Sequence, residues 1–112
     1  MSIRLYLLQR ASAAILAVLV LVHLAVIAYA VQGGLGAEEI LSRTRGSLGW
    51  GLFYGLFVAT VTVHGSIGLR EILLEWLRLG RGAANGASWA AALVLLVLGL
   101  RAVWAVIGGG MA

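Results

Sequence analysis

Two histidines, His23 and His64, are the residues of this sequence whose type and position could do chemistry. Each lies deep in a long apolar run, where an imidazole is costly to bury without a partner. No acid or arginine lies at a matching depth, so the partner must be a backbone carbonyl, a hydroxyl, another subunit or a metal. Haem iron suits this need, because imidazole gives iron a lone pair from one nitrogen while an oxygen holds the other N–H. A single intramembrane histidine could equally form a helix-to-helix hydrogen bond, but two in 112 residues favour haem.

The spacing of the two histidines predicts separate binding sites. If the two runs are centred near Leu21 and Val58, His23 lies roughly 3 Å outward of the membrane midplane and His64 roughly 8 Å inward. The rings then differ in depth by roughly 11 Å, at about 1.5 Å per residue, which is too far for both to bind one iron. Each site would therefore take its second histidine from another chain. Because no carboxylate lies deep in a run, redox chemistry fits better than proton-coupled transport.

The elements that hold these histidines must be membrane helices. The chain is 62% hydrophobic and 11% charged, with a mean hydropathy of +1.07, far outside the range of soluble proteins. With roughly 20 to 25 apolar residues per crossing, 112 residues leave no room for a soluble catalytic domain. The chain contains no cysteine, so any haem is the non-covalent b type. A contiguous basic surface is absent, which argues against nucleic-acid binding.

The predicted fold class is all-α, with three transmembrane helices and a short interfacial helix. We interpret residues 1–112 as a single membrane-anchor domain, in which the first apolar run is retained because it is too long for a signal peptide. The adjacent glycines Gly33 and Gly34 should end the first helix, and a polar loop should follow. A linker rich in glycine and alanine is expected over 80–86. The predicted helices are about 8–31, 47–70 continuing at the interface to 79, and 88–107.

Arginines indicate the orientation, because basic residues concentrate on the cytoplasmic side of a membrane. With the N terminus inside, five arginines lie inside and three outside. The inner ones are Arg4, Arg10, Arg70, Arg78 and Arg81, and the outer ones are Arg43, Arg45 and Arg101. The expected location is the inner (cytoplasmic) cell membrane, with the N terminus cytoplasmic.

Two segments resemble a known family. The run from His64 to Trp76, with its His-x-x-x-Gly-Leu-Arg start, is similar to the second-helix signature of the small, D-type membrane anchor of succinate dehydrogenase and fumarate reductase. Residues 9–13 (Gln-Arg-Ala-Ser-Ala) resemble that family's entry into the first helix. The resemblance implies that His64 is an axial ligand of haem b. It also implies that His23 ligates a second haem farther from the cytoplasm, shared with a C-type partner anchor.

The resemblance further implies a quinone site at the inner end of the second helix. Arg70 belongs to the motif, Glu75 occupies its acidic position, and Trp76 replaces the tyrosine whose hydroxyl binds quinone in the family. The indole N–H of Trp76 can still donate a hydrogen bond, although an interfacial belt residue is an equal alternative. Arg10 and Ser12 could contact quinone or a haem propionate, or could serve as a topology-setting arginine and a small packing residue.

The function that we expect is a haem-b-binding anchor subunit of a succinate:quinone oxidoreductase, not catalytic by itself. By resemblance, it docks a flavoprotein subunit and an iron–sulfur subunit on the cytoplasmic face and helps to form the quinone site. One alternative is a haem-b anchor of another respiratory oxidoreductase. The other is a haem-free structural membrane subunit, in which both histidines bond to neighbouring helices.

Overall fold

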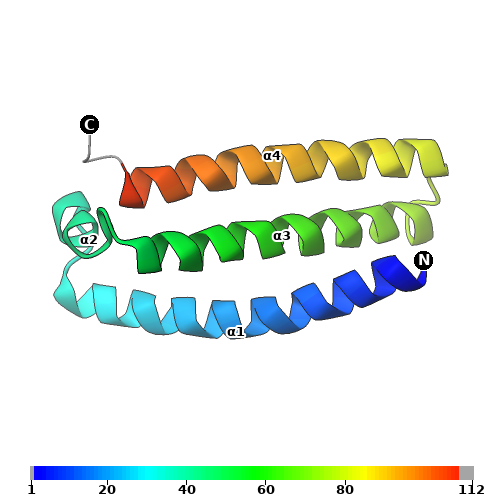
Figure 1. Cartoon of the computed structure of the whole chain (residues 1–112). Helices are drawn as coiled ribbons and strands as arrows, with labels where there is room; N and C mark the ends of the chain where they lie inside the picture. Colours follow the sequence, from blue (N-terminus) through cyan, green and yellow to red (C-terminus); the bar gives the residue numbers. More distant parts are fainter. Residues whose placement is uncertain (1, 109–112) are drawn as a thin grey trace.

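The computed structural model describes residues 2–108 and confirms the all-helical fold, with no strand in that range. Three of its helices are long and apolar enough to cross a membrane. They lie side by side with α3 in the middle, and the short α2 crosses one end (Figure 1). Helix α3 contacts both long neighbours, whereas α1 and α4 hardly touch each other. The helices are α1 (Ile3–Gly33), α2 (Ala37–Thr44), α3 (Leu48–Glu75) and α4 (Arg81–Ile107).

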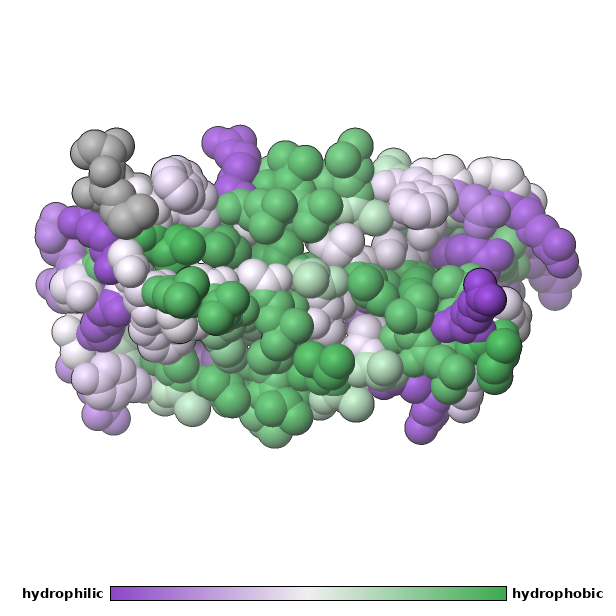
Figure 2. Space-filling view, viewed as in Figure 1, coloured by the Kyte–Doolittle hydropathy of each residue, from purple (hydrophilic) through white to green (hydrophobic). Residues whose placement is uncertain are grey.

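The surface of the molecule is that of a membrane protein. Hydrophobic residues gather over the middle of the long axis, and hydrophilic residues gather at both ends (Figure 2). Among the described residues, the buried hydrophobic side chains are Leu19, Ile67 and Ala84. Large apolar side chains are exposed along all three long helices. Lipid or partner subunits must therefore cover most of this chain, because water would not tolerate so large an apolar surface.

Helix α1 begins five residues earlier than predicted. The side chain of Ser2 accepts a hydrogen bond from the Leu5 N–H at 3.2 Å and so caps the helix, which starts at Ile3. The charged and polar residues before the apolar run therefore lie on the helix itself. The end of α1 is close to the predicted one, since Gly34 takes a φ of 107°, which favours glycine and stops the helix.

Helix α2 was missed, because the segment was expected to be a polar loop. Two glutamates, Glu38 and Glu39, lie in its first turn, and Arg43 lies in its last turn, where each charge suits the helix dipole. The end of α2 is tied to α4. The hydroxyl of buried Thr44 donates to the Val106 carbonyl at 2.6 Å, and the Gly46 N–H donates to the Ile107 carbonyl at 2.7 Å. These bonds satisfy carbonyls that the end of α4 would otherwise leave unpaired.

Helix α3 begins where the sequence indicates, with the side chain of Ser47 accepting from the Trp50 N–H at 3.2 Å. It continues past residue 70 as predicted but ends at Glu75, four residues before the predicted end at residue 79. The backbone turns at Arg78, whose φ of 53° is left-handed, and the Leu79 N–H donates to the Leu73 carbonyl at 3.0 Å. The short helix outside the spans is α2 instead.

The predicted linker over 80–86 is also wrong, since these residues form the first turns of α4. Packing against α3 outweighs the low helix propensity of the glycines here. Ala84 is fully buried, and Asn85 accepts a hydrogen bond from Arg70 at 2.6 Å. One turn later, the Ser88 hydroxyl donates to the Ser66 carbonyl at 2.8 Å. The packing of α4 on α3 thus begins at its first turns.

Glycines set how closely the long helices approach. A Cβ built on Gly99 of α4 would lie 2.5 Å from Cγ1 of Val58 on α3, so this contact requires glycine. On α3, Gly65 faces Leu95 of α4, and Gly68 faces Gln9 of α1. The glycines that follow His64 therefore let neighbouring helices come close, as small residues do in membranes.

Candidate functional site

The structure brings His64 of α3 and Ser12 of α1 together. The Ser12 hydroxyl oxygen lies 3.4 Å from Nδ1 of His64, and it is also 3.1 Å from the Gln9 carbonyl, to which it donates. Ser12 is buried at 6% exposure, whereas His64 is half-buried. Among the described residues, the ring's hydrogen bond is to this hydroxyl. An imidazole inside the apolar band thus has one nitrogen satisfied by this chain.

His64 also lines an open groove of about 420 Å³ on the surface of α1 and α3. The α1 side of this groove contains two alanines, Ala13 and Ala17, whose small side chains leave room beside the ring. The remaining lining residues are Leu16, Val20 and Leu21. The imidazole ring of His64 is therefore a polar group at the edge of an open, apolar groove. A flat apolar ligand or a partner helix could fill this groove.

His23 lies in an aromatic environment. Its ring packs edge-on against Tyr54, with 5.7 Å between ring centroids, and against Phe57, with 5.5 Å. Its Nδ1 atom is buried and lacks a hydrogen-bond partner among the described residues. A buried polar atom left unpaired costs about 1–3 kcal/mol. The ring borders an apolar groove of about 330 Å³ that is lined by residues of α1, α3 and α4.

The two histidine rings lie at different depths along the helix bundle. His23 packs against Phe57, which precedes His64 by seven residues on α3. At about 1.5 Å per residue, this corresponds to roughly 10 Å along the helix axis. The two rings therefore cannot bind opposite faces of one iron within this chain.

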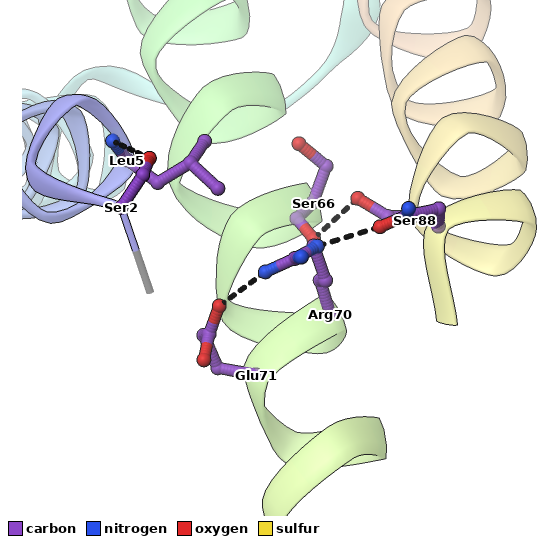
Figure 3. A network of polar contacts seen from close by, with 7 residues as sticks. Ser2, Leu5, Ser66, Arg70, Glu71 and Ser88 are labelled. Carbon is purple, nitrogen blue, oxygen red and sulfur yellow. Dashed lines mark hydrogen bonds and ion pairs between the residues drawn. The ribbon is translucent and has the colours of Figure 1, made fainter. Parts of the chain in front are cut away.

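Arg70 lies in a polar network between α3 and α4, at the end of the molecule where α1 begins (Figure 3). Its guanidinium forms an ion pair with Glu71 at 2.7 Å and donates from Nε to the Asn85 side chain at 2.6 Å. The Ser88 hydroxyl bonds to the Ser66 carbonyl beside it. These groups border a partly polar cleft of about 390 Å³. Arg70 thus has partners from two helices, which hold it at this end of the bundle.

The other predicted site residues do not converge within this chain. Arg10 is exposed, and its guanidinium lies 5.8 Å from the centre of the Tyr6 ring. Glu75 is exposed at the end of α3, and Trp76 is 80% exposed. A site that uses these three residues would need surfaces from another subunit.

Sequence reasoning missed the aromatic group around His23 and the α4 partners of Arg70. The aromatic group could have been predicted from the sequence, because its members lie at helical spacing on one face of α3. They are Trp50, Phe53, Tyr54 and Phe57, and neighbouring rings in this row lie within about 6 Å of each other. Asn85 could not have been found, because it was assigned to a linker rather than to a helix.

Comparison with known proteins gives one match. A family model described as the succinate dehydrogenase/fumarate reductase transmembrane subunit matches residues 2–100. No curated protein and no solved structure matches the chain.

Proposed function

The chain belongs to the succinate dehydrogenase/fumarate reductase transmembrane subunit family, and from this premise we propose that it is a haem-b-binding anchor of a succinate:quinone oxidoreductase. As a membrane subunit of this family, it associates with catalytic subunits. The observation that carries the haem proposal is the pairing of His64 with Ser12. An axial histidine needs one nitrogen for iron and an oxygen to hold the other, and this pair supplies both.

The residues present fit a haem. No group of three or more His, Cys, Asp or Glu side chains gathers within residues 2–108 to hold a bare metal ion. Haem iron needs only axial nitrogens from the protein, because the porphyrin supplies the remaining ligands. His64 provides such a nitrogen beside a groove that is lined in part by the small side chains of Ala13 and Ala17. Haem b, when bound, takes up and releases one electron at a time.

A second haem site at His23 is part of the same proposal. The buried and unpaired Nδ1 of His23 is a polar atom that this chain alone leaves unsatisfied. The apolar groove between α1 and α4 gives space next to the ring. Because the rings of His23 and His64 differ in depth, each would take its second axial ligand from a partner anchor subunit. The D-type assignment of this chain, with a C-type partner, stays a prediction.

The exposed apolar surface supports a second anchor subunit. The described part of the chain buries few of its large hydrophobic residues, and α1 and α4 hardly touch. Large apolar residues on α1 such as Val18 and Leu21 are more than half exposed. A partner helix against this face would complete the groove at His64 and could supply the second residue that holds the haem.

The quinone site would lie at the end of the bundle that contains Arg70. The Gln9 side chain lies at this end, and its amide oxygen is buried without a hydrogen-bond partner among the described residues. Trp76 is exposed nearby in the sequence and offers its indole N–H as a donor. Catalytic subunits docked on this face would then enclose a pocket that this chain leaves open.

The same face is the proposed cytoplasmic side of the inner membrane. It carries the N-terminus and the turn between α3 and α4, together with five of the eight arginines. The outer end carries α2 and the end of α4. This distribution follows the excess of basic residues on the cytoplasmic side. A flavoprotein subunit and an iron–sulfur subunit would dock on the inner face.

Purification of the complex through a tag on this chain tests the proposal. We expect co-purification of a flavoprotein and an iron–sulfur protein, succinate-dependent quinone reduction, and a reduced-minus-oxidised spectrum with the sharp α band of b haem. A b-haem complex without succinate oxidation would support an anchor of another respiratory oxidoreductase. A complex without any haem would leave a purely structural subunit.

A further inference from the structure

We propose that Ser12 is a positioning residue, which fixes the proton of His64 on Nδ1 and so presents the Nε2 lone pair to haem iron. The inference rests on the proposed function, because it concerns the preparation of His64 as an axial ligand. It also gives Ser12 a role that differs from the expected contact with quinone or a haem propionate. The structure places its hydroxyl against the ring of His64.

The shorter of the two contacts of the Ser12 hydroxyl indicates the direction of its hydrogen bond with His64. The hydroxyl of Ser12 has a single proton, and its oxygen lies 3.1 Å from the carbonyl of Gln9. A carbonyl can only accept, so this contact uses the proton of Ser12. The oxygen then has only lone pairs to offer to Nδ1 of His64 at 3.4 Å. The contact is favourable only if Nδ1 carries a proton.

The consequence appears on the other side of the ring. A neutral imidazole that is protonated on Nδ1 has its free lone pair on Nε2. An oxygen that accepts from Nδ1–H also makes Nε2 more basic and holds the ring in one orientation. Because Ser12 is buried at 6% exposure, bulk water does not compete for this contact. A residue of α1, Ser12, thus orients the candidate ligand His64 on α3.

Ser66 provides a matched comparison within the same chain. It is buried at 8% exposure, and its hydroxyl donates to the carbonyl of Val63 at 3.3 Å. Like Ser12, it bonds to the backbone three residues earlier in its own helix. Within residues 2–108, no hydrogen bond joins the Ser66 hydroxyl to a histidine. Ser66 therefore serves as the control for a buried serine whose hydroxyl bonds only to the backbone of its own helix.

The test compares Ser12→Thr with Ser12→Val in the purified complex. Threonine keeps the hydroxyl, whereas valine has nearly the same shape and lacks it. The measurements are the midpoint potential of the haem, its ferric electron paramagnetic resonance spectrum and the retention of haem. We expect valine to raise the midpoint potential, because a less basic imidazole stabilises ferric iron less. We also expect haem binding to weaken about 10-fold or more. Ser12→Thr and Ser66→Ala should match the wild type.

An unchanged potential and spectrum in Ser12→Val would overturn the inference while leaving the haem assignment intact. Failure of the proposed function has a different signature, since the wild-type complex would then lack haem or His64→Ala would retain all of it. If the branched side chains prevent assembly, Ser12→Ala is compared with Ser66→Ala by the same measurements. Equal potentials in these two alanine variants would likewise contradict a positioning role.

Discussion

The ring of His23 packs edge-on against Phe57, with 5.5 Å between their centroids, and this contact fixes the depth of His23 in the bundle. Phe57 lies two helical turns before His64 on α3. The contact therefore places the two candidate ligands roughly 10 Å apart along the axis of α3. The Nδ1 atom of His23 is buried and has no hydrogen-bond partner among the described residues.

Replacement of His23 by phenylalanine tests the role of this ring. Phenylalanine keeps the aromatic packing and lacks the ring nitrogens that could bind iron, so we expect the subunit still to fold and assemble. We also expect loss of the haem bound at His23, with the His64 haem retained. Haem quantification and thermal unfolding of the purified complex measure both effects. A His23→Phe complex with wild-type haem content would make His23 a packing residue.

The close contact between α3 and α4 should be sensitive to a single methyl group. In Gly99→Ala, the new Cβ meets the stiff side chain of Val58, so we expect a loss of about 1–3 kcal/mol of stability. Gly55→Ala is the matched control, because nothing in this chain lies within 4 Å of a Cβ there. That variant should gain up to about 1 kcal/mol from helix propensity. Equal unfolding temperatures for the two variants would refute the close approach of these helices.

The bond between Thr44 and the end of α4 should also be measurable. Thr44→Val removes the buried hydroxyl that donates to the Val106 carbonyl and leaves that carbonyl without this partner. We expect a loss of about 1 kcal/mol or somewhat more in thermal unfolding of the complex. Ser42 is the control, because its hydroxyl is exposed and bonds only within α2. A Ser42→Ala variant as unstable as Thr44→Val would show that the link to α4 contributes nothing.

Trp76 tests the proposed quinone site. Its side chain is 80% exposed, so Trp76→Ala should leave the fold and the haem content unchanged. If its indole N–H bonds to quinone, the KM for quinone should rise roughly 3- to 10-fold, as the loss of one hydrogen bond predicts. Trp104 is the control, because it is also well exposed but lies near the outer end of α4. Equal kinetics for Trp76→Ala and the wild type would assign Trp76 to the membrane interface alone.

The sequence predicted the membrane helices well where local signals were strong. Long uncharged runs defined the three spans, Ser47 marked the start of α3, and Gly33 and Gly34 marked the end of α1. The errors fell on segments whose structure depends on tertiary contacts. The first turns of α4 contain glycines that favour a linker, yet Ala84 and Asn85 pack against α3. Likewise, α2 depends on its bonds to the end of α4.

The candidate site was predictable in its residue types but not in its pairing. Burial cost alone singled out His23 and His64 in the apolar runs. The contact between Ser12 and His64 depends on the register of α1 against α3. Two apolar helices without a charge pair between them give no sequence signal for that register. Membrane interfaces use packing rather than hydrophobic contrast with the solvent, so amphipathic patterns cannot reveal it either.

The most direct test of the account is the haem content of the complex that contains His64→Ala. Ser66→Ala serves as the control, since it alters the same stretch of α3 and its hydroxyl bonds to the Val63 carbonyl. We predict that His64→Ala loses one haem relative to the wild type while the subunits stay assembled, and that Ser66→Ala keeps the full content. A His64→Ala complex that retains all of its haem would contradict the assignment of His64 as an axial ligand.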